Sequence, residues 1–152
     1  MKKMHFWILF IIIGLVLFLA VLSIISRKKP SLGLLSGRLQ PCPNRPNCVC
    51  SEDKNLSSYI EPLSFSGNAK SNWERTKQII HEMGGKIVHE DNCYLWATFS
   101  TRIFRFVDDL ELRMDEGNGV IHIRSGSRVG YSDMGTNRRR VEDFRVRFDQ
   151  KH

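Results

Sequence analysis

Seven arginines and no lysine lie between positions 124 and 147, and five of these arginines belong to the segment RSGSRVGYSDMGTNRRR at 124–140. A guanidinium group presents a planar fork of N–H donors that binds carboxylate or phosphate. Backbone amides at a helix N-terminus add further donors. We therefore expect this segment, an Arg/Ser/Tyr loop, to recognise an anionic group. The candidate binding residues are Arg124, Ser125, Ser127, Arg128, Tyr131, Ser132, Asp133, Asn137 and Arg138.

The same segment also has a structural interpretation. Asp133 is placed to cap the last helix, and the glycines permit positive φ angles. Asp108, Asp109 and Glu111 lie on a neighbouring predicted strand and are ready partners for the arginines. This interpretation predicts buried ion pairs in place of a ligand site.

A catalytic interpretation rests on Asp108. A buried carboxylate can act as a base, and Arg124 or Arg128 could then hold an oxyanion, which would make the protein a small hydrolase. Asp108 and Asp109 are consecutive in a strand and point to opposite faces, so they cannot easily share a proton. The serines lack a G-x-S-x-G motif. We therefore expect a binding module more than an enzyme, with no cofactor and no metal.

Four cysteines suggest one structural disulfide. Cys42 and Cys48 bracket the proline-rich loop CPNRPNC, and a bridge there would close about seven residues and stabilise the fold by about 2.3 kcal/mol. Free thiols and a zinc site are the alternatives, although C-x5-C-x-C with scattered histidines lacks the usual zinc spacing. A disulfide implies an oxidising, exoplasmic compartment.

The first thirty residues predict a membrane anchor. Residues 1–5 are basic, and residues 6–25 are uncharged, with sixteen Phe, Ile, Leu or Val among twenty. A helix of that length spans about 30 Å, the thickness of a bilayer core. A cleaved signal peptide is the alternative, but the apolar run is longer than usual and no A-x-A site follows. Positive charge flanks both ends of the apolar run, so the positive-inside rule only slightly favours a cytoplasmic domain. The cysteines favour the opposite side of the membrane.

Composition excludes two broad classes of protein. The chain is 41% hydrophobic, which is too apolar for disorder. Its net charge of +7 comes largely from five basic residues among the first thirty, and residues 31–152 carry 18 basic and 16 acidic side chains. We therefore expect no nucleic-acid partner.

The remaining sequence predicts an α+β domain. Residues 26–70 contain all five prolines and are expected to form a linker with the Cys42/Cys48 loop, and residues 71–150 form the domain. A helix begins at Ser71, which forms a capping box with Glu74. Strands follow at 86–90, 93–100, 104–114 and 120–127, and a last helix begins near Thr136. The expected fold is a four-stranded antiparallel sheet with flanking helices, and a barrel or grip around the terminal helix is the alternative.

Regular alternation along 104–114 places Asp108 on the apolar face together with Leu110 and Leu112. Two outcomes are possible. Either a bulge resets the register near Asp108, or this carboxylate is buried and must be paired.

Three segments resemble the signature blocks of a bacterial and plastid family, domain of unknown function 1499: CPNRPNCVCS, FRFVDDLELR and VIHIRSGSRVGYSDMGTNRRRVE. The likeness covers about residues 40 to 148. It implies a small domain behind a membrane or export segment, with no established activity, cofactor or substrate. The family motif carries over onto Cys42, Cys48, Asp108, Asp109, Arg124, Ser125, Arg128, Gly130, Tyr131, Ser132, Asp133, Asn137 and Arg138. Cys50 departs from the small hydroxyl residue usual in the family, which leaves open its pairing with Cys48 or Cys93.

These observations together predict a bacterial inner-membrane protein with one anchor and a periplasmic domain. The domain is expected to act as a binding or scaffold module for an anionic lipid headgroup, a glycan or a partner's carboxylate. The small hydrolase and a structural component of a membrane protein complex are the alternatives.

Overall fold

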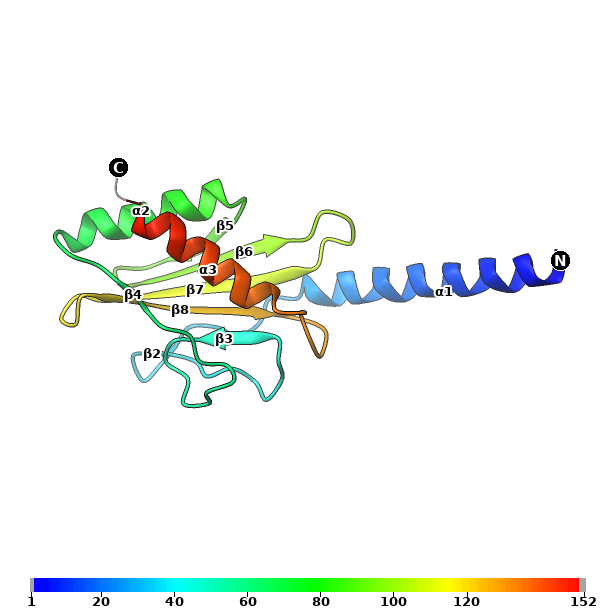
Figure 1. Cartoon of the computed structure of the whole chain (residues 1–152), viewed down its shortest axis with the longest axis horizontal. Helices are drawn as coiled ribbons and strands as arrows, with labels where there is room; N and C mark the ends of the chain where they lie inside the picture. Colours follow the sequence, from blue (N-terminus) through cyan, green and yellow to red (C-terminus); the bar gives the residue numbers. More distant parts are fainter. Residues whose placement is uncertain (1, 151–152) are drawn as a thin grey trace.

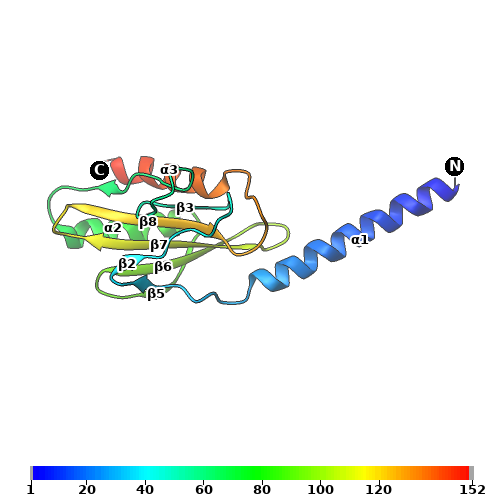
Figure 2. The ribbon, with the colours of Figure 1, turned by 90° about the horizontal axis from the view of Figure 1, so that it is seen from below.

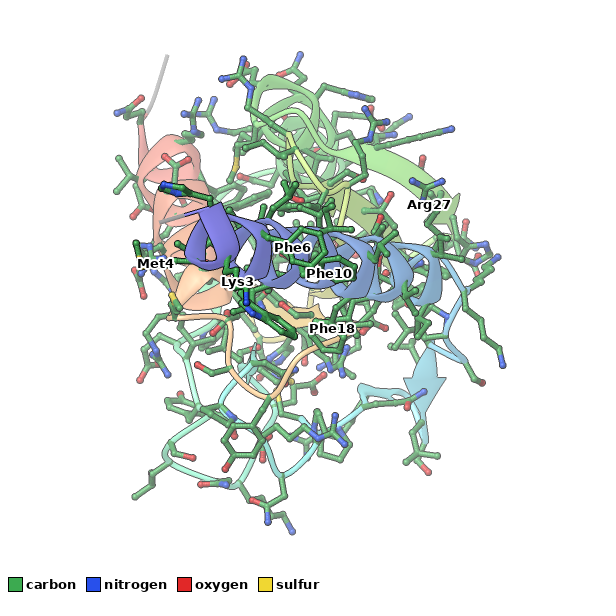
Figure 3. The ribbon with its side chains drawn as sticks, turned by 90° about the vertical axis from the view of Figure 1, so that its right-hand side faces the viewer. Lys3, Met4, Phe6, Phe10, Phe18 and Arg27 are labelled. Atoms are coloured by element: carbon green, nitrogen blue, oxygen red, sulfur yellow. A yellow bond between two sulfur atoms is a disulfide. The ribbon has the colours of Figure 1, made fainter. Side chains whose placement is uncertain are left out.

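The computed structural model describes residues 2–150. The first element is helix α1, Lys2–Ser26, which runs away from the rest of the chain (Figure 1). The stretch Lys3–Ser26 is long and apolar enough to cross a bilayer, and only 6% of its apolar window is buried. Figure 3 looks along α1 toward the domain and shows Phe6, Phe10 and Phe18 standing out from the helix. All three side chains are exposed, as expected of a membrane anchor or a signal sequence.

The domain is built on a six-stranded antiparallel sheet. Its strand order is β3-β8-β7-β6-β5, and β4 also pairs with β8. The strands are β3 Cys48–Cys50, β4 Leu63–Ser64, β5 Lys86–Glu90, β6 Tyr94–Ser100, β7 Val107–Asp115 and β8 Val120–Ser127. A separate two-stranded sheet joins β1, Leu34–Leu35, to β2, Arg38–Leu39. The α+β class is confirmed, but the predicted number of strands, four, was too low, because the main sheet has six strands.

The segment 26–70, expected to be a linker, contains four of these short strands. β3 pairs with the end of β8 and β4 with its beginning, so the segment satisfies backbone groups that β8 would otherwise leave open along one edge. Strands of two or three residues are too short to show alternation in the sequence. This is why the linker prediction missed them.

Two helices cover one face of the sheet (Figures 1 and 2). They are α2, Ala69–Glu82, and α3, Thr136–Asp149. Their apolar side chains pack on those of β6, β7 and β8 in the main core, which includes Trp73, Ile80, Val141, Phe144, Leu110, Leu112, Ile121 and Ile123. The other face carries a smaller cluster of Leu39, Tyr94 and Trp96, against which Leu32 and Leu34 pack. The chain between α1 and β3 therefore covers part of the second face.

The helix starts show one difference from the predicted pattern. Helix α2 begins at Ala69 because Asn68 is its N-cap, and the side-chain oxygen of Asn68 accepts a hydrogen bond from Ser71 N at 2.9 Å. The predicted cap at Ser71 was therefore three residues late. Helix α3 begins at Thr136 as predicted, after Gly135 in the left-handed conformation. Asp133 accepts from Gly135 N and from Asn137 N at 2.9 and 2.6 Å.

The predicted disulfide joins Cys42 to Cys48. Cys50 is a buried free thiol and Cys93 is an exposed one. The alternative pairings of Cys50 with Cys48 or Cys93 are therefore not adopted. Burial raises the pKa of the Cys50 thiol from 9.0 to about 11.

The raised pKa of Cys50 predicts a pH effect on stability. Below pH 9 the Cys50 thiol is neutral in both states, and its burial contributes fully to the free energy of unfolding. As the pH rises toward 11 the thiol of the unfolded chain loses its proton first, so this contribution is lost. The loss should approach about 2 to 3 kcal/mol. Urea unfolding of the wild type and of Cys50→Ala at pH 8 and pH 10.5 measures it. We expect the difference between the two proteins to shrink at the higher pH, and a constant difference would contradict the prediction.

Candidate functional site

The acidic residues of β7 alternate between the two faces of the sheet. β7 pairs with β8 in unbroken register from Asp108 opposite Ser127 to Asp115 opposite Val120. No bulge therefore resets the strand, and Asp108 shares the helix-covered face with Leu110 and Leu112. Asp109 and Glu111 point to the other face. Of the two outcomes predicted for Asp108, the buried and paired one is found.

Arg140 of helix α3 is the partner of Asp108. Its Nη2 lies 2.6 Å from Asp108 Oδ2, and both side chains are about nine-tenths buried. Nη1 of Arg140 donates to Asn137 Oδ1 at 2.6 Å and to Ser125 Oγ at 3.0 Å. Asn137 in turn donates to Ser127 Oγ at 2.9 Å and to Asn47 O at 3.0 Å. This network ties α3, β8 and the disulfide loop together.

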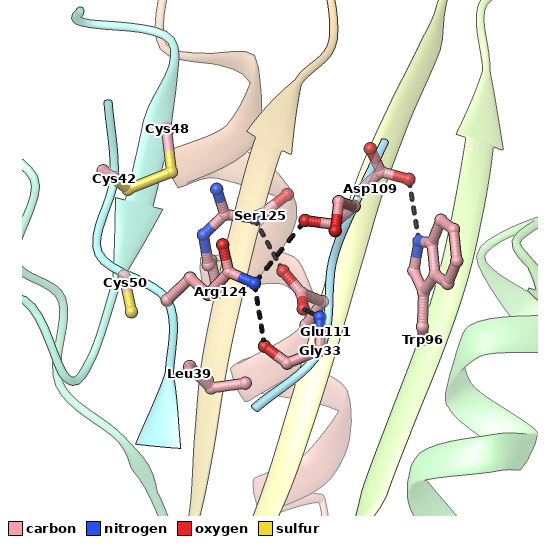
Figure 4. A network of polar contacts seen from close by, with 12 residues as sticks. Gly33, Leu39, Cys42, Cys48, Cys50, Trp96, Asp109, Glu111, Arg124 and Ser125 are labelled. Atoms are coloured by element: carbon pink, nitrogen blue, oxygen red, sulfur yellow. Dashed lines mark hydrogen bonds and ion pairs between the residues drawn. A yellow bond between two sulfur atoms is a disulfide. The ribbon is translucent and has the colours of Figure 1, made fainter. Parts of the chain in front are cut away.

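Glu111 is the centre of a second network, on the opposite face (Figure 4). Its side chain is fully buried and lies 2.6 Å from Arg124 Nη1. Its other oxygen accepts from the Tyr94 hydroxyl at 2.6 Å and from Gly33 N at 3.3 Å. Burial and the bond to Glu111 raise the pKa of Tyr94, which therefore stays protonated and donating. The chain leaving α1 is thereby fastened to the sheet.

Asp109 completes this face. It accepts from Trp96 Nε1 at 2.7 Å and receives a bidentate pair from Arg128, with Nε at 2.8 Å and Nη2 at 2.7 Å. Lys29 Nζ lies 4.9 Å from the centre of the Trp96 ring. Asp108, Asp109 and Glu111 are thus each paired with an arginine, as the structural interpretation of the sequence predicts.

Arg128 also contacts the end of the apolar helix. Its Nη1 donates to Ser26 O at 3.2 Å and to Lys28 O at 3.3 Å. Val107 N donates to Ser26 Oγ at 3.3 Å. A cation at a helix C-terminus is favourable because the last carbonyls are otherwise open and the helix dipole is negative there. The Arg128 side chain therefore joins the end of α1 to the sheet, and the Ser26 hydroxyl adds a second contact.

Removal of the Arg128 guanidinium should loosen this junction. In Arg128→Gln, Asp109 keeps the hydrogen bond from Trp96 but loses the ion pair with the guanidinium. We expect the free energy of unfolding of the domain to fall by about 2 to 3 kcal/mol. We also expect a broader distance distribution between spin labels on α1 and on β7, measured by pulsed electron resonance. Arg139→Gln is the matched control, since among residues 2–150 the Arg139 guanidinium bonds within its own helix start, to Met134 O and Thr136 Oγ1. Distance distributions of equal breadth in the two variants would contradict the role of Arg128 in joining α1 to the sheet.

The structure does not bring together the residues that a hydrolase would need, Asp108 as the base and Arg124 or Arg128 as the oxyanion group. Asp108 lies on the helix-covered face with Arg140, whereas Arg124 and Arg128 bind Glu111 and Asp109 on the other face. The sheet itself separates the suggested base from both suggested oxyanion groups. No group of three or more His, Cys, Asp or Glu side chains within residues 2–150 could hold a metal.

The predicted binding residues divide into two sets. The first set is buried or half-buried and bonded inside the fold: Arg124, Ser125, Ser127, Arg128, Asp133 and Asn137. The second set lies at the surface. In it, Arg138 donates to Ser57 O and Tyr59 O, Ser132 accepts from Met134 N, and Tyr131 is 72% exposed. The surface of the Arg/Ser/Tyr loop is thus formed by its middle, near Tyr131.

A small cleft lies between Tyr131 and the disulfide loop. It has a volume of about 240 Å³, and its lining includes Asn44, Arg45, Asn55, Ser57, Ser58 and Tyr131. Arg45 is the one charged residue in this lining. Sequence reasoning missed Arg45, although its place in the middle of CPNRPNC was a usable signal. It also missed the partnership of Arg140 with Asp108, which depends on how α3 crosses the sheet.

Glu52, which follows β3, links β2 to β7 through a backbone hydrogen bond and an ion pair that the sequence did not reveal. Glu52 receives both a bidentate pair from Arg113, at 3.1 and 2.9 Å, and a bond from Leu39 N at 2.7 Å. Burial would raise the pKa of Glu52, but these hydrogen bonds outweigh it and hold that pKa below its ordinary value. The pair supports the second face of the sheet.

The sequence profile of one family, described as protein of unknown function (DUF1499), matches residues 38–148. The chain belongs to this family. The DUF1499 match begins with β2 and ends in α3, so it includes the arginine–carboxylate pairs of both faces, the disulfide and the cleft, and it excludes α1. The comparison found no matching curated protein and no matching solved structure.

Proposed function

We propose that this DUF1499 protein is a membrane-anchored binding or scaffold module of the bacterial cell envelope. Helix α1 crosses the inner membrane, and the domain faces the periplasm. The domain recognises an anionic group on a lipid headgroup, a glycan or a protein partner, and it carries out no catalysis. The observation that carries this proposal is Arg128, which holds the end of α1 and the acidic strand β7 in one fixed unit.

The disulfide supports the periplasmic side of the membrane. A bridge between Cys42 and Cys48 persists in an oxidising compartment, and the periplasm is the one adjoining a bacterial inner membrane. The acids of β7 are all paired with arginines, which fits a rigid scaffold better than a general base. Arg45 and the hydroxyl and amide groups of the cleft offer donors to an anionic or hydroxyl-rich ligand.

The native thiol Cys93 tests the location without any substitution. It is exposed, whereas Cys50 is buried with a raised pKa. A membrane-impermeant maleimide should therefore label Cys93 in intact spheroplasts, and Cys93→Ser should abolish the labelling. Labelling that requires lysis of the spheroplasts would place the domain in the cytoplasm and overturn the proposal.

Binding is tested with the full chain in zwitterionic nanodiscs. The probes are glycerol 1-phosphate, which represents a lipid headgroup, and a peptidoglycan disaccharide-peptide, which represents an anionic glycan. We expect saturable binding of one probe that weakens about tenfold in Arg45→Gln, the loss of about one charged hydrogen bond. Lys54→Gln is the control, because Lys54 is exposed and outside the cleft lining. Equal binding of the probe by the two variants would exclude the cleft as the binding site.

A further inference from the structure

The strand registers bring three loops to the end of the domain where α1 leaves it. Ser100 pairs with Val107 across β6 and β7, Asp108 pairs with Ser127 across β7 and β8, and Cys48 pairs with Gly126 across β3 and β8. The loop 101–106, the loop 128–135 and the disulfide loop therefore lie at one end of the sheet. Ser26 contacts Val107 and Arg128 at that same end.

Two of these loops extend beside α1. Figure 1 shows the loop between β6 and β7, and the loop between β8 and α3, both reaching past the end of α1 in the direction of its N-terminus. Figure 2 shows the same for the loop between β6 and β7. If α1 crosses a bilayer, the bilayer surface that faces the domain lies close to the last turns of α1. The tips of these two loops then lie at the level of that surface.

Each of these two loops carries one large apolar side chain that contacts little of the protein. Ile103 is 84% exposed and Met134 is 88% exposed, so neither side chain is covered by the described part of the fold. Met134 has φ of 53°, a left-handed conformation that glycine or asparagine adopts with less strain. Local hydrogen bonds hold this turn, because Met134 N donates to Ser132 Oγ and Arg139 Nη1 donates to Met134 O, and the methionine side chain stays outside the fold.

The charge around these tips is positive. Arg102 and Arg105 are exposed in the first loop, and Arg27 and Lys28 are exposed directly after α1. Asp133 is the one acid in the two loops, and its carboxylate is engaged by Gly135 N, Asn137 N and Asn137 Nδ2. Exposed apolar side chains and exposed cations at one end of the domain match an anionic bilayer surface, where the apolar groups enter the interface and the cations meet phosphates.

We propose that the loops 101–106 and 128–135 form a membrane-contact surface that binds the anionic lipids around α1. Ile103 and Met134 enter the interfacial region, and Arg102 and Arg105 bind lipid phosphates. This surface rests on the proposed anchor, and it adds that the domain lies against the bilayer in one orientation. The cleft beside Tyr131 is then presented next to the lipid headgroups.

The test measures the depth of each loop with the full chain in vesicles. The background is Cys93→Ser, which leaves Cys50 as a buried free thiol, and single cysteines are introduced by Ile103→Cys, Met134→Cys and Glu116→Cys. Glu116 is exposed in the turn after β7, about 27 Å from the membrane end by the length of that strand. Each site carries the environment-sensitive dye NBD, and lipids with a nitroxide in the acyl chain act as quenchers.

We expect blue-shifted, quenched emission at positions 103 and 134 in vesicles of phosphatidylcholine with phosphatidylglycerol, and aqueous emission at 116. Arg102→Gln should lower the ratio of docked to undocked domain about fivefold in these vesicles and leave it unchanged in phosphatidylcholine alone. Equal quenching in both lipids would overturn the binding of anionic lipid.

The failure of this inference is distinguishable from failure of the anchor. Resistance of the chain to alkaline extraction from the vesicles reports whether α1 is inserted. An inserted chain with aqueous emission at 103, 134 and 116 would overturn the membrane-contact surface and leave the anchor intact. A chain released by alkali would overturn the anchor and the surface with it.

Discussion

Glu111→Ala is expected to lower the free energy of unfolding of the domain by about 3 to 5 kcal/mol. The substitution leaves the Arg124 guanidinium buried without its carboxylate, and Arg124 Nε already has no hydrogen-bond partner among the described residues. The Tyr94 hydroxyl and Gly33 N lose their acceptor as well. Urea unfolding of the full chain in detergent, followed by tryptophan fluorescence, measures the loss.

Two further variants separate the charge effect from general damage. Asp143→Ala removes an exposed carboxylate that pairs with Arg147 on α3, and it should change the stability by no more than about 0.5 kcal/mol. The double variant Glu111→Leu with Arg124→Met should recover much of the loss, because a buried pair can be replaced by apolar groups. A single Glu111→Ala variant as stable as Asp143→Ala would show that the network is not structural.

Asp108→Asn is expected to destabilise the domain by about 3 kcal/mol, because Arg140 keeps its charge on the helix-covered face and loses the opposite charge. The guanidinium also lies 4.9 Å from the centre of the Phe99 ring, which leaves it little space to reach water. Glu142→Gln, which alters an exposed pair with Arg145 on the same helix, is the matched control and should leave the stability unchanged.

The same variant decides between a structural and a catalytic carboxylate. A hydrolase that used Asp108 as its base would keep its fold in Asp108→Asn and lose turnover of ester or phosphoester substrates. We expect the opposite result, a marked loss of stability with no activity to lose. Unchanged unfolding together with a measurable loss of hydrolysis would contradict the assignment.

The parts of the fold that the sequence predicted are those with long regular patterns. β6, β7 and β8 have seven to nine residues each, and their alternation was readable, as was the burial of Asp108 on the apolar face. β3 and β4 have three and two residues, and pairing with β8 defines them more than their own composition does. Such strands exist because an edge needs a partner, which local sequence does not reveal.

The arginines illustrate the same limit for the candidate site. The sequence placed seven arginines near three acids, and the pairing of the two groups was predictable from charge alone. Which arginine meets which acid depends on the register of β8 and on the crossing of α3. The second role of Arg128, at the carbonyl of Ser26, joins residues 102 positions apart, and no local pattern encodes it.

The central claim, an uncleaved anchor with an oxidised domain outside the cytoplasm, is tested most directly by intact mass spectrometry. The full chain is extracted from membranes under denaturing, thiol-blocking conditions without reduction. We expect a mass that retains α1, one disulfide, and two blocked thiols, at Cys50 and Cys93. A chain with four blocked thiols would contradict the periplasmic location, and a chain that lacks the first 26 residues would contradict the anchor.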